Sequence, residues 1–403
     1  MTARTPVVTG LGVVSAAGIG ATNFWQGLQQ GTPRFREVSL FPTGDLPNRI
    51  AGEIGGWTPG FDAIDADRLD GDRTATFALA ALDEAIADAG LGDIRPDRVL
   101  LGTTVGDVAD HERARRDAVQ TGAGLPGTLD VDGSLRTRVA RHLGGSIPVD
   151  LFVTACAAGN MALIRAAQLV TSGSADVVIC GGAEAISRMA FTGFSRMRGM
   201  ARERCRPFSD ARDGLLLGEG SAFLIVESAA HAAARGVPVR ATVAGYGLTC
   251  DAKHPAAPDL SGDGVARAMR SAIAAADPSD VAYVCAHGTG TPQNDAAEAA
   301  AYRKVFTQSP PPISSIKALI GHSLGAASAI EAVACTLVLT HQRTIPQWGL
   351  DGEGTSLGVR PATGGPDDAA RIDLVLNNAI AFGGNNTCVG LRRPEAAYQE
   401  ATA

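Results

Sequence analysis

The sequence predicts an α/β protein with a mainly parallel sheet, and three observations carry that prediction. Apolar, β-branched runs of strand length alternate with helical patterns along the whole chain. Glycine-containing turns repeatedly follow the apolar runs, and the chain contains 49 glycines. Apolar residues make up 45% of the 403 residues, which is enough to fill a substantial core. We therefore expect either two domains of ordinary size or one large intertwined domain.

The first half of the chain begins with a buried strand that enters a glycine loop. Further strands are apolar runs bounded by turn residues, and helices are stretches with apolar residues at helical spacing. The predicted strands are 7–15, 98–102, 149–153, 175–182 and 221–227. The predicted helices are 22–30, 75–89, 134–143 and 157–170. Residues 108–123 are charged and mixed, and the sequence does not assign them to an element.

The second half repeats the same rhythm of strand, glycine turn and helix. Its predicted strands are 241–248, 281–286, 313–316, 372–376 and 387–391. Its predicted helices are 263–276, with Asp263 as the expected N-cap, 295–305 and the long apolar 323–339. No low-complexity linker separates the halves, so we expect two similar halves, 1–240 and 241–403, in one structure.

Charge and composition exclude several classes of protein. The net charge of -7 argues against a general nucleic-acid binder. No apolar run approaches the roughly 18 residues that a membrane span needs. The N-terminal residues lack the long apolar region of a signal peptide. Seven cysteines, an odd number without a C-x-x-C pair, indicate reduced thiols, so we expect a cytoplasmic protein.

One cysteine stands at a tight turn between a predicted strand and a predicted buried helix. Cys156 lies in Thr154-Ala155-Cys156-Ala157-Ala158-Gly159, where small neighbours leave room for a substrate. The partial positive charge of a helix N-terminus favours a thiolate, which suits a nucleophile. A buried structural cysteine is the competing interpretation, and it is the commoner one for an isolated cysteine.

Two of the seven histidines occupy similar loops in the second half. His287 follows an apolar strand and opens a glycine-threonine loop, and His322 directly precedes the long apolar helix. Each alone could be a structural histidine, but α/β proteins place reactive side chains at such strand ends. Together with Cys156 they favour a catalytic site.

Lys317 supports this interpretation because it interrupts an apolar run in a chain with only three lysines. A buried ammonium without a partner is costly, and Glu331 on the following helix is the candidate partner. The alternative is a lysine whose ammonium reaches solvent from a strand end.

A serine hydrolase is another interpretation to be weighed. Gly321-His322-Ser323-Leu324-Gly325 matches the G-x-S-x-G nucleophile motif. That fold requires an acid and then a histidine after the serine. Only His341 follows Ser323, and the one acid between them, Glu331, lies in the same predicted helix, so the triad order is not available.

Four ordered motifs resemble the β-ketoacyl-acyl-carrier-protein synthases of the Cys-His-His branch, which includes fatty-acid and polyketide ketosynthases. They are the turn around Cys156, the loop 287–292, the stretch 317–325 and the loop Phe382-Gly383-Gly384-Asn385-Asn386. The resemblance implies the thiolase fold, in which two similar βαβαβαββ halves form five α-β-α-β-α layers. It also implies a dimer.

The resemblance further implies a decarboxylative Claisen condensation with a role for each residue. Cys156 would carry the acyl chain, His287 and His322 would drive decarboxylation of a malonyl thioester, and Lys317 with Glu331 would order the histidines. The backbone N–H groups of Cys156 and Phe382 would form the oxyanion hole. Thr289, Thr291, Phe194 and the gating Phe382 would bind substrate carried on phosphopantetheine, so no free cofactor or metal is expected.

The segment Gln293-Asn294-Asp295 is more similar to secondary-metabolite ketosynthases than to housekeeping fatty-acid enzymes, so we expect a polyketide or polyene ketosynthase. The chain also departs from the family pattern at three positions. Ser209 stands where many relatives have aspartate, Ala381 replaces a glycine and Asn385 replaces a threonine or histidine. The expected partners are an acyl carrier protein and either a second copy or a chain-length factor. The alternative function is a non-catalytic chain-length-determining subunit, which the presence of Cys156 disfavours.

Carrier proteins of this family are usually acidic, so an acidic chain needs a local basic patch to bind one. Arg202 and Arg206, in the arginine-rich stretch 196–206, are candidates, as are Arg68 and Arg73. A solvated arginine-rich loop without a docking role is the competing interpretation.

Overall fold

Ten strands of one sheet form a continuous path through the molecule. The computed structural model describes residues 2–64, 73–124, 134–350, 352, 354–366 and 368–395, and Arg68 lies outside them. The path runs β11-β10-β12-β13-β9-β1-β8-β7-β5-β6. The strands from the first half are β1 (Pro6–Ser15), β5 (Arg98–Gly102), β6 (Val149–Phe152), β7 (Val177–Glu184) and β8 (Gly220–Ser228). Those from the second half are β9 (Ala241–Cys250), β10 (Val281–Cys285), β11 (Ile313–Ser314), β12 (Leu374–Ile380) and β13 (Asn385–Arg392).

The two halves have the same strand order. Numbered from one to five along each half, the strands lie in the order 3-2-4-5-1 in both. The halves meet where β1 pairs with β9, at Val7 opposite Thr242 and Val8 opposite Ala241. The repeated rhythm of the sequence therefore corresponds to a repeated topology.

The expectation of a mainly parallel sheet is wrong, because the sheet is mixed. β5 pairs in parallel with β6 and β7, and β10 with β11 and β12. β8 and β13 run antiparallel to their neighbours. Only four residues join β12 to β13, too few for a parallel crossover. A strand that is covered on both faces is apolar along its whole length, whether it pairs in parallel or antiparallel. The sequence pattern therefore could not distinguish parallel from antiparallel pairing.

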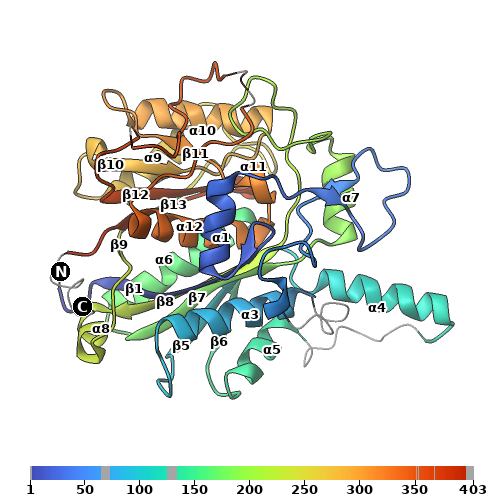
Figure 1. Ribbon diagram of the computed structural model, residues 1–403, viewed down its shortest axis with the longest axis horizontal. Helices are drawn as coiled ribbons and strands as arrows, with labels where there is room; N and C mark the ends of the chain where they lie inside the picture. The colour runs from blue at the N-terminus through green and yellow to red at the C-terminus, as the bar shows by residue number, and fades with distance from the viewer. Residues whose placement is uncertain are drawn as a thin grey trace.

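The elements stack in five layers, as expected from the resemblance (Figure 1). Helices α3 (Arg73–Asp88) and α5 (Leu135–His142) cover one outer face, and α9 (Asp263–Ile273) and α10 (Pro292–Val305) cover the other. Between the two parts of the sheet lie α6 (Ala158–Thr171) and α12 (Ala327–His341). The loops at one end of these central helices carry the residues predicted to be reactive.

The remaining elements are short or peripheral. Helix α4 (Val108–Thr121), which the sequence left unassigned, projects from the body in Figure 1. Asp263 does not cap α9, because Gly262 holds the cap position in a left-handed conformation and the Asp263 carboxylate pairs with Lys304. The other elements are β2 (Gly18–Ile19), α1 (Ala21–Gln30), β3 (Arg36–Glu37), β4 (Ile50–Ala51), η1 (Phe61–Ala63), α7 (Arg188–Arg196), α8 (Ala229–Arg235) and η4 (Pro278–Asp280).

One helix corrects the statement that no apolar run is long enough to span a membrane. Leu324–His341 comprises 18 residues with a mean hydropathy of 1.5. Its burial gives the physical reason for this composition: 89% of the segment is enclosed by the protein, between the two parts of the sheet. Such a segment is typical of the core helix of a large α/β fold.

Candidate active site

The Cys156 turn connects the edge strand β6 to the central helix α6. A single 3-10 turn, η3 (Ala155–Ala157), carries the cysteine, and Ala155 adopts a positive φ of 50°. A non-glycine residue in this region marks a strained turn of the kind found at functional sites. Cys156 is buried among small residues at the start of α6, as predicted.

The predicted thiolate is not the resting form of this cysteine. Burial raises the pKa of Cys156 to about 12, and the charge of Lys317 lowers it only in part. The amide end of α6 also acts to lower this pKa, but it does not outweigh the loss of water around the sulfur. The free protein therefore holds a thiol that must give up its proton during the reaction.

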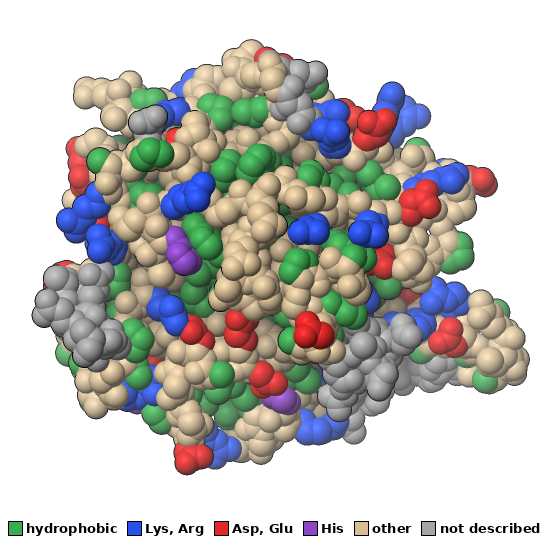
Figure 2. Space-filling view, viewed as in Figure 1, with side chains coloured by type: hydrophobic (Ala, Val, Ile, Leu, Met, Phe, Trp, Pro, Cys, Tyr) green, Lys and Arg blue, Asp and Glu red, His purple; other side chains and the backbone are tan. Residues whose placement is uncertain are grey.

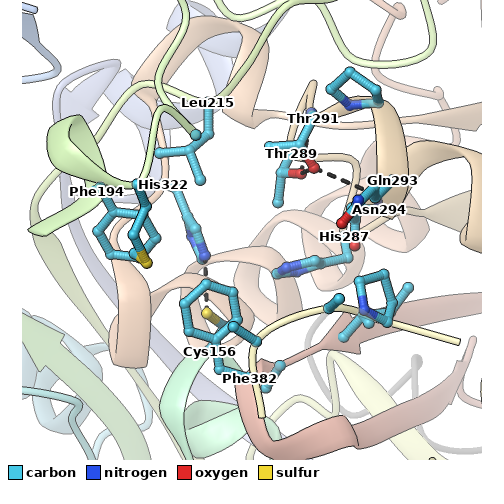
Figure 3. A pocket seen from close by; sticks show the side chains of 18 of the residues that line it. Cys156, Phe194, Leu215, His287, Thr289, Thr291, Gln293, Asn294, His322 and Phe382 are labelled. Atoms are coloured by element: carbon cyan, nitrogen blue, oxygen red, sulfur yellow. Dashed lines mark hydrogen bonds between the residues drawn. The ribbon is translucent and has the colours of Figure 1, made fainter. Parts of the chain in front are cut away.

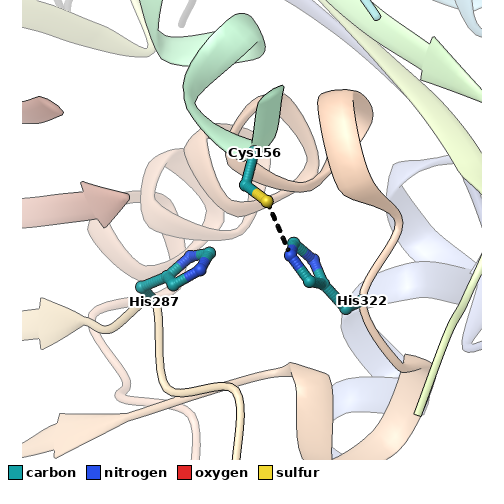
Figure 4. A group of neighbouring side chains, drawn as sticks. All are labelled: Cys156, His287 and His322. Atoms are coloured by element: carbon teal, nitrogen blue, oxygen red, sulfur yellow. Dashed lines mark hydrogen bonds between the residues drawn. The ribbon is translucent and has the colours of Figure 1, made fainter. Parts of the chain in front are cut away.

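An imidazole nitrogen lies in contact with the sulfur. His322 Nε2 is 2.9 Å from Cys156 Sγ (Figure 4). The rings of His287 and His322 meet edge to face, with centroids 5.2 Å apart and an interplanar angle of 83°. Three side chains from distant parts of the sequence thus converge, as the sequence predicted.

A buried ion pair stands behind His287. Lys317, which is 1% exposed and begins α11 (Lys317–Ile320), pairs with Glu331 on α12. The same ammonium lies 3.4 Å from His287 Nδ1. Because an ammonium can only donate, Nδ1 accepts and the ring proton resides on Nε2. Burial is the main cause that raises the pKa of Glu331 to about 7.

Both imidazoles are neutral in this environment. Burial and the charge of Lys317 hold the pKa of His287 and of His322 well below the usual range. The ligand atoms of Cys156, His287 and His322 lie within 4.8 Å of one another, a spacing that would suit a metal ion. However, the proton fixed on His287 Nε2 removes the lone pair that a metal would need there, so the cluster is better suited to proton exchange and hydrogen bonding.

Two acids that sequence reasoning missed shape the His287 loop. Glu298 accepts the backbone N–H groups of His287 and Gly288 at 2.8 and 2.7 Å. Asp295, one turn earlier on α10, accepts the N–H of Gly290 at 3.2 Å. Their spacing of three residues on a helix directly after the loop was the available signal, since it puts both carboxylates on one face.

A cavity of about 700 Å³ opens onto the three side chains (Figure 3). Thr289 and Thr291 line it, and their hydroxyl oxygens are 2.9 Å apart. Phe194 and Phe382 stack with ring centroids 5.7 Å apart, and Phe382 is 41% exposed at the mouth. The structure therefore places all four predicted substrate-binding side chains at one cavity. Lining residues that the prediction did not include are, among others, Met197, Arg198, Leu215, His254, Gln293 and Asn294.

The predicted docking arginines divide into three groups. Arg202 is exposed and Arg206 is partly exposed. Arg73 is wrongly predicted, because its guanidinium is buried in an ion pair with Glu219 and cannot reach a partner protein. Arg68 lies outside the described residues. Figure 2 shows basic side chains interspersed with acidic ones around α7 and α4.

The serine-hydrolase arrangement is not formed. Ser323 is buried, and His341 stacks on Trp25 at the far end of α12. At 1.5 Å per residue, about 25 Å of helix separates the two side chains. The motif match is therefore incidental to this fold.

Comparison with known proteins places these features in a family. The models of the β-ketoacyl synthase N-terminal and C-terminal domains match residues 4–232 and 240–351. A 3-oxoacyl-[acyl-carrier-protein] synthase 2 from Synechocystis is 33% identical, over 96% of this chain and 97% of its own. A putative polyketide beta-ketoacyl synthase 1 from Streptomyces cyaneus is 36% identical, over 97% and 98%.

Solved structures agree with this placement. The ishigamide ketosynthase/chain length factor structure superposes with a TM-score of 0.83 at 34% identity, covering 97% of this chain and 100% of the other. Both family models together match most of the chain, and the relatives align along nearly their full length. The chain therefore belongs to the β-ketoacyl synthase family of thiolase-fold acyltransferases.

Proposed function

We propose that this enzyme joins an acyl chain carried on Cys156 to a malonyl group on an acyl carrier protein, with loss of carbon dioxide. The observation that carries this proposal is the contact of Cys156 Sγ with His322 Nε2, beside His287 and at the end of one cavity. A non-catalytic chain-length subunit is not favoured, because it would have no use for a nucleophile held against a base.

Acyl transfer to the enzyme comes first. Cys156 Sγ attacks the carbonyl carbon of a carrier-bound thioester while its proton passes to His322 Nε2. The resulting imidazolium then returns that proton to the departing phosphopantetheine thiolate. The covalent intermediate separates one difficult transfer into two easier ones and gives ping-pong kinetics.

Malonyl decarboxylation follows at the same cavity. Loss of carbon dioxide leaves an enolate, and His287 Nε2–H donates a hydrogen bond to its oxygen. Acylated Cys156 no longer donates to His322, so that ring can carry its proton on Nε2 and supply the second donor. One donor of this kind is typically worth ~10²–10³ in rate.

The enolate carbon then attacks the acyl-Cys156 carbonyl. The backbone N–H groups of Cys156 and Phe382 hold the oxyanion of the tetrahedral intermediate. The attack forms the new carbon–carbon bond. Collapse of the intermediate then restores the carbonyl and breaks the bond to the Cys156 sulfur, which regains a proton. The reaction takes up one proton overall because the carboxylate leaves as carbon dioxide.

The substrate arm enters along the side of the cavity away from Cys156. The hydroxyls of Thr289 and Thr291 hydrogen-bond the phosphopantetheine amides, and Phe194 and Phe382 gate access to the sulfur. All substrates arrive on this arm, so we propose no free cofactor and no metal. Arg202 and Arg206 provide positive charge for an acidic carrier protein.

A second subunit binds at the edge of the sheet. β6 ends the strand path, and Leu151 and Val153 beside it are 42% and 64% exposed. An open edge with exposed apolar side chains favours pairing with another chain. We propose either a second copy or a chain-length factor here, in a cytoplasmic enzyme whose halves 1–240 and 241–403 supply the nucleophile and the histidines respectively.

The relatives include both fatty-acid and polyketide enzymes, and the segment Gln293-Asn294-Asp295 favours a polyketide or polyene product. The decisive experiment is to incubate the purified protein with acyl-loaded and malonyl-loaded carrier protein and to analyse both by mass spectrometry. The proposal requires an acyl adduct on Cys156 and a carrier-bound β-ketoacyl product. A Cys156→Ala variant that still forms the product would exclude it.

A further inference from the structure

The turn that carries Cys156 has a counterpart in the second half of the chain. In each half, a 3-10 turn directly precedes the central helix that follows the third strand, and in the second half the short helix α11 lies between the strand and the turn. The second turn is η5 (Leu324–Ala326), which precedes α12. Leu324 has a φ of 44°, close to the 50° of Ala155. Gly325 therefore takes the middle position that Cys156 holds in the first turn.

The turn at Cys156 borders the cavity, whereas the turn at Gly325 packs against other parts of the protein. A Cβ on Gly325 would lie 2.4 Å from the carbonyl carbon of Thr103 and 2.5 Å from the nitrogen of Thr104, so only glycine fits. The Gly325 N–H donates to Glu184 Oε2 at 3.0 Å. The Glu184 carboxylate thus accepts a hydrogen bond from the backbone N–H in the middle of the second turn. At the first turn, the corresponding position beside Cys156 is open to substrate.

Glu184 stands at the end of β7 and joins this turn to the loop after β5. Its Oε1 accepts the Thr103 hydroxyl and the N–H groups of Val105 and Gly106, at 3.0, 3.0 and 3.2 Å. Its Oε2 accepts the N–H of Thr104 at 2.6 Å in addition to that of Gly325. The side chain is completely buried. Burial raises the pKa of Glu184, and the donated hydrogen bonds oppose that rise. Because all five partners donate, their geometry suits the ionised carboxylate.

His322 depends on this anchor. Its own backbone is bonded on one side only, to the extended segment 216–218: its N–H donates to Leu216 O at 2.7 Å, and its carbonyl accepts from Gly218 N–H at 3.0 Å. Three residues later, Glu184 holds Gly325 on the other side. We infer that Glu184 is a positioning residue that fixes the His322 imidazole against Cys156, an inference that rests on the proposed function.

Substitution of Glu184 by glutamine separates this role from simple space filling. The carboxamide has nearly the same shape but only one accepting oxygen. Its best orientation satisfies the three donors at Oε1 and turns its NH2 group toward the N–H groups of Thr104 and Gly325. The variant should therefore release Gly325, and with it the His322 loop, while keeping the loop after β5 in place.

The test compares Glu184→Gln with Glu84→Gln. Glu84 also accepts two backbone N–H groups, those of Val13 and Ala21, but it lies on α3 away from the cavity. We expect Glu184→Gln to lower kcat for malonyl decarboxylation ~10²-fold, as for a misplaced oxyanion donor, with KM changed less than twofold. The negative charge of Glu184 also raises the pKa of Cys156. The variant should therefore speed alkylation of Cys156 at a fixed pH of 9, whereas Glu84→Gln should change neither quantity.

Two results would overturn the inference: a kcat within twofold of wild type in Glu184→Gln, or an equal fall in Glu84→Gln, which would indicate general loosening. If the wild-type protein itself formed no product, the proposed function would fail instead. The alkylation rate at pH 9 requires no carrier protein, so in that case it decides the inference: an unchanged rate in Glu184→Gln overturns it.

Discussion

Replacing Lys317 by methionine should lower both the stability of the fold and the rate of the proposed decarboxylation. The two effects can be measured separately. The variant leaves the Glu331 carboxyl buried without its ammonium partner, so its pKa rises above the value of about 7 that it has beside Lys317. Since the pKa in the folded state already exceeds the ordinary glutamate value of 4.5, the folded state favours the protonated form. The difference in stability between variant and wild type is therefore small below pH 7 and grows as the pH rises above it.

The size of that loss follows from the pH interval. Above pH 7 wild type has released the Glu331 proton, whereas the variant retains it. Each such pH unit lowers the stability of the variant by 1.36 kcal/mol, so the loss of stability reaches about 3 kcal/mol at pH 9. This agrees with the ~3–5 kcal/mol for removing one partner of a buried ion pair. With an unfolding entropy of about 2.1 cal/mol/K per residue, the melting temperature should fall by about 3–4 °C at pH 9 and by less at pH 6.

A double variant separates stability from activity. Lys317→Met combined with Glu331→Leu replaces the ion pair by apolar groups, which is often neutral for stability. It should melt close to wild type at both pH values. Decarboxylation should stay low, by ~10²–10³, because nothing then holds the proton of His287 on Nε2. Recovery of decarboxylation in the double variant would refute the reasoning, since Lys317 would then act only on Glu331.

Four further outcomes are expected. Iodoacetamide labelling of Cys156 should accelerate with pH through pH 9 without levelling off, and a plateau near pH 7 would contradict the resting thiol. Val153→Asp should convert a dimer to monomers in sedimentation experiments, and an unchanged mass would remove β6 from the interface. Charge reversal at Arg202 and Arg206 should weaken carrier-protein binding at low salt, and equal affinity would assign docking elsewhere. Ser323→Ala should keep full condensing activity, whereas loss of an esterase activity would revive the hydrolase interpretation.

The sequence predicted the convergence of Cys156, His287 and His322 because each follows an apolar segment and stands among small residues. Lys317 was predicted to belong to the site because a buried ammonium needs a partner, and Glu331 on the following helix was the available acid. These inferences depended on local pattern and on charge, both of which a linear sequence contains.

Other features depended on packing that local pattern does not record. Burial raises the pKa of Cys156 by more than the helix N-terminus lowers it. How deeply the turn is buried depends on the whole fold, which the local sequence does not show. Arg73 lies in an ordinary charged stretch, yet its partner Glu219 comes from a strand boundary 146 residues later. The antiparallel direction of β8 and β13 could not be predicted for a related reason. Strands that are covered on both faces have no polar side, so their residue pattern does not indicate how they pair.

The burial of α12 has a consequence for synthesis of the chain. This apolar helix leaves the ribosome before β12 and β13, which end at Arg392, so its contacts with them cannot form until some fifty further residues have been made. During that interval the part of this apolar segment that β12 and β13 later cover is exposed to water and to other nascent chains. Truncations before β12 should therefore precipitate rather than yield a smaller soluble fragment, and chaperone supply should govern the recovery of full-length protein.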